Sequence, residues 1–154
     1  MIRRARPKEA LYLTALALRS KAYWGYSAEF IEACREELTY TADQIGGGDL
    51  QFYVSESDGL LSGFYALGQL SSDAVELAAL FVDPPYIGTG IGRALIDHAK
   101  RKAAQLGALT LIVQGDPNAA RFYRAVGGKL TGQRESASIP GRYLPIFAIA
   151  LADS

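Results

Sequence analysis

The residues that point most directly to chemistry are three glycines, Gly88, Gly90 and Gly92, which alternate between an apolar run and a helical pattern. The apolar run reads as a strand that ends at Val82, and Asp83 with two prolines breaks it. Glycine lets the backbone approach a ligand closely, because no side chain stands in the way. The free N–H groups of a first helical turn bind anions, and the helix dipole favours their charge. The pattern therefore predicts a phosphate-binding loop.

Two common phosphate-binding motifs do not fit this loop. A P-loop requires Lys and then Ser or Thr after its last glycine, whereas Arg93 and Ala94 follow Gly92. A dinucleotide-binding fingerprint requires G-x-G-x-x-G after the first strand of its domain, whereas this loop lies past the middle of the chain. A glycine-rich turn without a ligand is the structural alternative. Alternating glycines cost chain entropy, which favours a ligand.

The loop resembles the acetyl-CoA loop of the GNAT superfamily of N-acetyltransferases, whose consensus is Val-x-Pro-x-Tyr/Trp-Arg/Gln-Gly-x-Gly-Ile/Val-Gly-x-x-Leu. The positions that match are Val82, Pro84, Tyr86, Gly88, Gly90, Ile91, Gly92 and Leu95. Ile87 departs from the pattern, because the family usually has Arg or Gln there. The resemblance assigns most pyrophosphate contacts to main-chain N–H groups, so binding is expected to survive, and Arg93 is a candidate for a compensating charge.

Composition excludes several other classes of function. The chain has 154 residues, of which 49% are hydrophobic and 21% charged, as in soluble globular proteins. Equal numbers of basic and acidic residues, 16 each, give no global charge for nucleic acid or an anionic membrane. A single Cys and a single His leave no disulfide or zinc pattern. We therefore expect one cytoplasmic domain over residues 1–154, with no metal, nucleic-acid or membrane partner; a homodimer is left open.

Hydrophobic periodicity and turn residues predict the element order β-α-α-β-β-β-α-β-α-β-β. The expected strands cover 2–6, 50–55, 60–70, 75–82, 109–114, 129–134 and 143–151, and the expected helices 7–18, 28–38, 91–106 and 118–126. Residues 46–48 are all glycine and read as a flexible break. The order resembles that of the GNAT fold. The resemblance implies an α/β (α+β) fold with a mixed central β-sheet of six to seven strands, flanked by about four helices and splayed between strands 4 and 5.

A second segment, residues 116–124, resembles the family pattern Asn-x-x-Ala/Arg-x-x-Phe/Leu-Tyr on the helix after the fifth strand. Tyr123 matches the family tyrosine that faces the CoA sulfur and protonates it, and an ordinary tyrosine is protonated at neutral pH. Asn118 is expected to cap its helix, and the resemblance has it also reach the pantetheine arm. A purely structural aromatic is the alternative for Tyr123.

By the same resemblance, the pantetheine lies in the splay and pairs with the main chain of Phe81 and Val82, where an N–H polarises the carbonyl. Core packing is the alternative role of these side chains, and the two roles are compatible. The residues expected to bind acetyl-CoA are Phe81, Val82, Ile87, Gly88, Thr89, Gly90, Ile91, Gly92, Arg93, Asn118 and Tyr123.

Glu76 is the candidate base for the amine. It is a carboxylate on an otherwise apolar strand, which is expensive to bury without a partner. Several enzymes of the family use a Glu at this place, often through a water molecule. A carboxylate at the strand end, in solvent or in an ion pair, is the alternative.

The acceptor of the family lies between the first two helices and the last strands. Tyr23, Trp24 and Tyr26 occupy the first region, where aromatics can wall an amine pocket. Arg142 occupies the second, where it could clamp a carboxylate. Packing of the two helices is the alternative role of the aromatics. No acidic patch for polyamines or basic peptides is evident, which favours a small amine.

Together these residues predict an N-acetyltransferase that uses acetyl-CoA and a primary amine as its substrates, and a small molecule is the acceptor that we expect. No residue stands out as a nucleophile, which favours direct transfer in a ternary complex. The alternatives are a non-catalytic acyl-CoA-binding or sensor module of the same fold, a protein or peptide N-acetyltransferase, and a nucleotide-binding domain.

Overall fold

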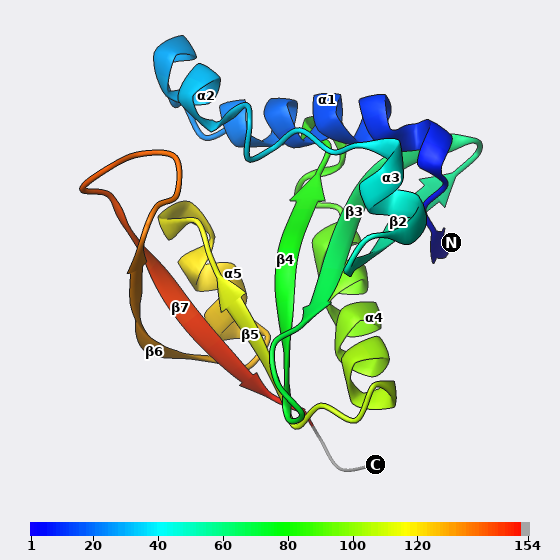
Figure 1. Ribbon diagram of the computed structural model, residues 1–154. Helices are drawn as coiled ribbons and strands as arrows, with labels where there is room; N and C mark the ends of the chain where they lie inside the picture. Colours follow the sequence, from blue (N-terminus) through cyan, green and yellow to red (C-terminus); the bar gives the residue numbers. More distant parts are fainter. Residues whose placement is uncertain (152–154) are drawn as a thin grey trace.

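The computed structural model describes residues 1–151, which form one seven-stranded sheet with helices on both faces (Figure 1). The strands are β1 (Ile2–Arg4), β2 (Leu50–Ser57), β3 (Leu60–Gln69), β4 (Ala74–Val82), β5 (Thr110–Gln114), β6 (Gly128–Glu135) and β7 (Tyr143–Ala150). The helices are α1 (Ala10–Ala22), α2 (Ala28–Cys34), α3 (Ala42–Gly47), α4 (Ile91–Gln105) and α5 (Ala120–Ala125), with 3₁₀ turns η1 (Pro7–Glu9), η2 (Pro84–Tyr86) and η3 (Pro117–Ala119).

The sheet is mixed, and it opens at its one parallel pair. Its order is β1-β2-β3-β4-β5-β7-β6, with every pair antiparallel except β4–β5. β4 pairs with β5 only from Ala74 to Leu77, although β4 continues alongside β3 to Val82. Figure 1 shows β5, β7 and β6 turning away from β4 beyond this point. The mixed sheet with a splay between strands 4 and 5 is confirmed.

A bulge in β4 lies where the splay begins. Ala79 pairs with Ala66 of β3 and Leu77 pairs with Leu67, so that Ala78 is an extra residue on β4. A bulge bends its strand and re-aims the side chains that follow. Leu77 therefore belongs to the core beside α4, whereas Ala79 belongs to the core beside α1.

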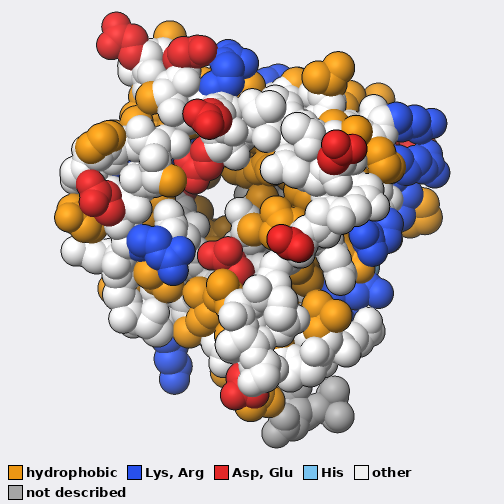
Figure 2. Space-filling view, viewed as in Figure 1, with side chains coloured by type: hydrophobic (Ala, Val, Ile, Leu, Met, Phe, Trp, Pro, Cys, Tyr) orange, Lys and Arg blue, Asp and Glu red, His pale blue; other side chains and the backbone are white. Residues whose placement is uncertain are grey.

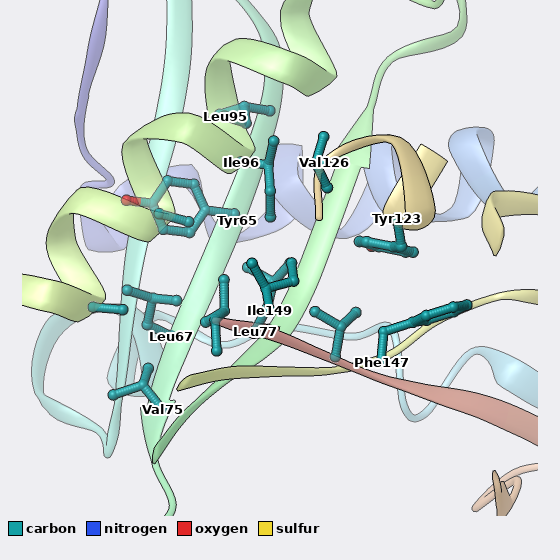
Figure 3. Close-up of a cluster of buried hydrophobic side chains, with 14 of the residues drawn as sticks. Tyr65, Leu67, Val75, Leu77, Leu95, Ile96, Tyr123, Val126, Phe147 and Ile149 are labelled. Carbon is teal, nitrogen blue, oxygen red and sulfur yellow. The ribbon is translucent and has the colours of Figure 1, made fainter. Parts of the chain in front are cut away.

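Two hydrophobic cores hold the sheet between its helices. One lies beneath α4 and α5, where Leu95 and Ile96 are fully buried against side chains of the sheet (Figure 3). The other lies beneath α1, where Leu13 and Leu16 are fully buried. Each such side chain contributes roughly 1.5–3 kcal/mol on burial. Since the α4–α5 core also includes Phe147 of β7, it connects the two halves of the sheet across the splay.

Helix α3 shows where the sequence analysis was wrong, because residues 46 and 47 continue a helix instead of forming a flexible break. Thr41 caps this helix, and Gln44 completes a capping box. Ile45 is buried in the α1-side core, so tertiary packing outweighs the low helix propensity of glycine. A Cβ on Gly46 would lie 2.9 Å from Cγ of Pro7, so glycine also permits this close packing.

Other boundaries differ by a few residues. Helix α1 continues to Ala22 rather than ending at Leu18, and α2 ends at Cys34 rather than at Leu38. Ser27 caps α2, because its Oγ accepts a hydrogen bond from the Phe30 N–H (3.1 Å). Within the described residues no helix combines the length and the apolar character needed to cross a membrane.

Candidate active site

A cavity of about 580 Å³ occupies the splay of the sheet. All residues of β4 from Leu77 to Val82 line it, from the point where pairing with β5 ends. The glycine loop, α5, the end of α1 and the β6–β7 loop supply the other walls. Figure 2 shows this hollow in the face of the molecule, with Asp and Glu side chains around its rim.

The glycine loop has the backbone shape and the open space that an anion site needs. Gly88 and Gly90 have φ values of +83° and +92°, which disfavour other residues. A Cβ built on either glycine would meet no heavy atom within 4 Å, so the space beside the loop is open. Within residues 1–151 the first N–H to bond inside α4 is that of Ala94, to the carbonyl of Gly90 (3.0 Å). The N–H groups of residues 91–93 are therefore available to an anion.

Side chains around the loop divide between the cavity and the core. Ile87 and Arg93 line the cavity, and Arg93 Nε lies 3.4 Å from Oδ1 of Asp97. Ile91 packs against the α4-side core instead, and the Thr89 hydroxyl donates to the main-chain carbonyl of Tyr86. The two residues thus belong to the loop without lining the cavity.

The free edge of β4 combines a backbone binding surface with packed side chains. Beyond Leu77 no strand of the described residues 1–151 pairs with β4 on its β5 side. The Phe81 ring meanwhile packs against Phe64, with 5.7 Å between ring centroids. The main chain of Phe81 and Val82 can therefore bind a ligand while their side chains pack in the core, so both roles expected of these residues are compatible with the geometry.

Tyr123 presents its hydroxyl to the cavity while its ring is packed. The residue is 6% exposed, and its ring stacks on Phe147 at 5.8 Å. No described residue forms a hydrogen bond with the hydroxyl. Every fully buried side-chain oxygen of the described residues has a hydrogen-bond partner, so the Tyr123 oxygen is not fully buried and is accessible from the cavity that the residue lines. Burial, and secondarily the charge of Asp116, raise the pKa of Tyr123 above its ordinary value. The hydroxyl therefore keeps its proton at neutral pH.

Two glycines that the sequence analysis did not single out, Gly115 and Gly128, allow close packing against Tyr123. A Cβ on Gly115 would lie 3.0 Å from the Tyr123 ring, and one on Gly128 would lie 2.7 Å from its carbonyl oxygen. A side chain at either position would therefore push α5 away from β5 and β7.

A polar cluster around Asp116 closes one end of the cavity. The carboxylate accepts from Lys21 Nζ (2.5 Å), from the Tyr26 hydroxyl (3.0 Å) and from Asn118 Nδ2 (3.0 Å), and Nη2 of Arg142 lies 3.6 Å away. Burial alone would raise the pKa of Asp116, but the hydrogen bond and charge of Lys21 lower it below the ordinary value. Asp116 is therefore ionised and neutralised by its partners. Sequence reasoning missed Asp116 and Lys21, because their pairing is long-range.

The residues predicted to bind the acceptor are only partly brought together. Arg142 and Trp24 line the cavity, whereas Tyr23 and Tyr26 are not among its lining residues. Arg142 donates to the Tyr26 hydroxyl (2.8 Å), and Asn118 donates to the same oxygen (2.9 Å). Tyr23 is 53% exposed. The guanidinium of Arg142 is thus already engaged within the protein.

Glu76 lies outside the set of residues that line the cavity. It sits on the paired part of β4, opposite Ile112 of β5. One of its carboxylate oxygens is 3.8 Å from Nη1 of Arg134, and its side chain is 26% exposed. The geometry favours the ion-pair alternative, and the assignment of Glu76 as the base stays a prediction.

Comparisons with known proteins identify a matching family and similar proteins. Residues 17–127 match the model of the acetyltransferase (GNAT) family. The chain is similar to the peptidyl-lysine N-acetyltransferase YjaB of Escherichia coli, with 32% identity over 152 residues, 97% of this chain and 95% of that protein.

Solved structures share the fold over nearly the whole chain. A GCN5-related N-acetyltransferase from Rhodopseudomonas palustris superposes with a TM-score of 0.80 at 25% identity, covering 98% of this chain and 95% of that one. The PaiA N-acetyltransferase from Thermoplasma acidophilum, solved in complex with coenzyme A, gives a TM-score of 0.78 at 22% identity, covering 97% and 98%.

Proposed function

Since the chain belongs to the acetyltransferase (GNAT) family and is an acyltransferase, we propose that it transfers an acetyl group from acetyl-CoA to a primary amine. The observation that carries the proposal is the continuity of one cavity, which joins the glycine loop, the free edge of β4 and the Tyr123 hydroxyl. Anion binding, backbone pairing and proton donation are thereby available along a single path. These are the functions that acetyl-CoA and its leaving thiolate require.

The donor is held mainly by main-chain groups in this proposal. The free N–H groups of residues 91–93 bind the pyrophosphate in the open space beside Gly88 and Gly90, and the edge of β4 from Ala78 to Val82 binds the pantetheine arm. Asn118 and Arg93 contribute side-chain contacts at the two ends of that path. When bound, acetyl-CoA supplies the acetyl group as a thioester.

Direct transfer in a ternary complex agrees with the raised pKa of the Cys34 thiol, the one thiol of the chain. Cys34 lines the cavity, but burial raises the pKa of its thiol, which disfavours the nucleophilic thiolate. The amine is therefore the group that attacks the carbonyl carbon. The C–S bond breaks as the C–N bond forms, and Tyr123 gives its proton to the departing sulfur, since its raised pKa keeps it protonated. The amine nitrogen loses a proton to solvent water as the amide forms, and solvent returns a proton to Tyr123.

Glu76→Gln is the substitution that tests the base. We expect kcat at neutral pH to stay within about threefold of the wild-type value, because the carboxylate faces Arg134 rather than the cavity. Such a surface ion pair is worth about 0–1 kcal/mol, so the melting temperature should move little. Steady-state kinetics from pH 6 to pH 10 check this. A kcat that falls at least tenfold at neutral pH and recovers at high pH would establish Glu76 as the base instead.

Two classes of acceptor are consistent with this site. A small amine is the class that the sequence analysis favoured. A lysine side chain on a protein is the second candidate, because the relative YjaB is named a peptidyl-lysine N-acetyltransferase. Both present a primary amine on a flexible alkyl chain.

Thiol release from acetyl-CoA, measured against a panel of small amines, amino acids and lysine-containing peptides, tests the proposed function. We expect release above the background rate with at least one primary amine, and none with its N-acetylated form. Acetyl-CoA binding without thiol release across the whole panel would point instead to a non-catalytic acyl-CoA-binding module.

A further inference from the structure

The acceptor end of the cavity carries one acidic group, Glu37, that makes no direct ion pair among residues 1–151, although the two cations and two carboxylates at this end balance in formal charge. The charged side chains that line the cavity are Lys21, Glu37, Arg93, Asp116 and Arg142. Lys21 and Arg142 both lie against Asp116, at 2.5 and 3.6 Å. Arg93 lies next to the glycine loop and contacts Asp97. Within residues 1–151 no Lys or Arg forms an ion pair with Glu37.

Glu37 lines the cavity, is exposed like its neighbour Glu36, and is oriented by the β6–β7 loop. It lies in the turn that follows α2, and its Oε2 accepts a hydrogen bond of 2.6 Å from Oγ of Ser138 in the β6–β7 loop. The N–H of Ser138 donates in turn to Ser136 Oγ (3.2 Å). A carboxylate offers about four acceptor positions, so this bond orients Glu37 and leaves most of them for a ligand.

Two aromatic residues of the cavity wall, Tyr40 and Trp24, accompany this carboxylate. Burial, and next the charge of Glu37, raise the pKa of Tyr40, which lines the same cavity. Trp24 also lines it, and the face of an indole ring attracts cations. Figure 2 shows Asp and Glu side chains around the hollow, with Lys and Arg side chains at the right edge of the view and also to the lower left of the hollow.

We propose that Glu37 determines acceptor specificity by binding a second cationic group, so that the acceptor is a small amine with two positive charges at neutral pH. This inference rests on the proposed acetyl transfer to an amine. One nitrogen reacts at the β4 edge beside Tyr123, while the other pairs with the carboxylate that Ser138 orients. The sequence analysis did not single out Glu37, because the residue that orients it, Ser138, lies 101 residues away in the chain.

The test compares kcat/KM for 1,5-diaminopentane and for 1-aminopentane, which have the same carbon chain and differ in one ammonium group. We expect the wild-type enzyme to prefer the diamine roughly 10- to 100-fold, as for a hydrogen bond to a charged group. Glu37→Gln should reduce that preference to about threefold or less, mainly by raising KM for the diamine. Ser138→Ala keeps the charge but frees the carboxylate, so it should reduce the preference only partly.

Glu36→Gln is the matched control. Glu36 is the neighbouring residue, is exposed and does not line the cavity, so the same change of charge should leave the preference intact. An unchanged preference in Glu37→Gln, or an equal loss in Glu36→Gln, would overturn the inference. Equal kcat/KM values of the wild-type enzyme for 1-aminopentane and for the diamine would also overturn the inference, while leaving the proposed function in place. Only a lack of thiol release with every amine tested would contradict both.

Discussion

Tyr123→Phe is expected to lower kcat by roughly 100- to 10,000-fold, the range that a positioned general acid contributes. The substitution removes only the hydroxyl, which faces the cavity without a hydrogen-bond partner among the described residues. The ring can keep its stacking on Phe147, so affinity for acetyl-CoA should change little. Pre-steady-state thiol release, under conditions in which chemistry limits the rate, measures the loss directly.

Tyr53→Phe is the control for this prediction. Tyr53 is buried to nearly the same extent as Tyr123, at 7% against 6% exposed, but does not line the cavity. Its substitution should leave kcat within about threefold of the wild-type value. If Tyr123→Phe behaves like this control, Tyr123 has no part in proton transfer and its role is structural.

The pKa of Tyr123 also predicts the alkaline side of the pH profile. Burial first, and the charge of Asp116 second, raise this pKa above the ordinary value of about 10. A raised pKa means that the acid form persists to higher pH, so kcat should show no alkaline fall below about pH 10. A fall between pH 8 and pH 9, with a stable fold, would indicate a different proton donor.

Gly90→Asp is expected to weaken acetyl-CoA binding by about 1000-fold. A Cβ at this position meets no heavy atom within 4 Å, so the carboxylate would enter the open space beside the loop. At about 4 Å from a phosphate charge, repulsion near a protein surface is about 4 kcal/mol, or nearly three decades of affinity. Isothermal titration calorimetry measures the change, and the loss should shrink at high salt.

Gly90→Ala separates the charge from the backbone conformation. The φ value of +92° is unfavourable for any L-residue other than glycine, at a cost of about 1–2 kcal/mol. The alanine variant should therefore weaken binding about 30-fold or less, without salt dependence. Acetyl-CoA should raise the melting temperature of the wild-type protein far more than that of Gly90→Asp. Equal affinities in Gly90→Asp and wild type would remove the glycine loop from the binding site.

The sequence predicted the parts of the fold that local patterns determine. The spacing of apolar residues identified α4, whose predicted end differs from the observed one by a single residue. The glycines and prolines located the loop at the entrance to that helix, because they encode backbone conformation directly. The mixed sheet was expected because the predicted element order resembles that of the GNAT fold, although the order lacked α3.

Long-range contacts account for what the sequence did not predict. Asp116 forms ion pairs with Lys21 and Arg142, which are distant in the sequence. The sequence alone therefore did not indicate that the Asp116 carboxylate is neutralised. Helix α3 was missed because Ile45 is buried by tertiary packing, against the local preference of glycine. The β4 bulge at Ala78 depends on the pairing register with β3, which periodicity does not contain.

The central claim, direct acetyl transfer from acetyl-CoA to an amine in this cavity, is tested most directly by mass spectrometry of a single turnover with and without 1,5-diaminopentane. With the amine, we predict one N-acetylated product for each free CoA. Without it, we predict that the protein mass stays unchanged, because the Cys34 thiol is a poor nucleophile when burial raises its pKa. An acetylated protein that forms without the amine and then transfers its acetyl group would contradict direct transfer. Free CoA without any acetylated amine would contradict the acetyltransferase reaction itself.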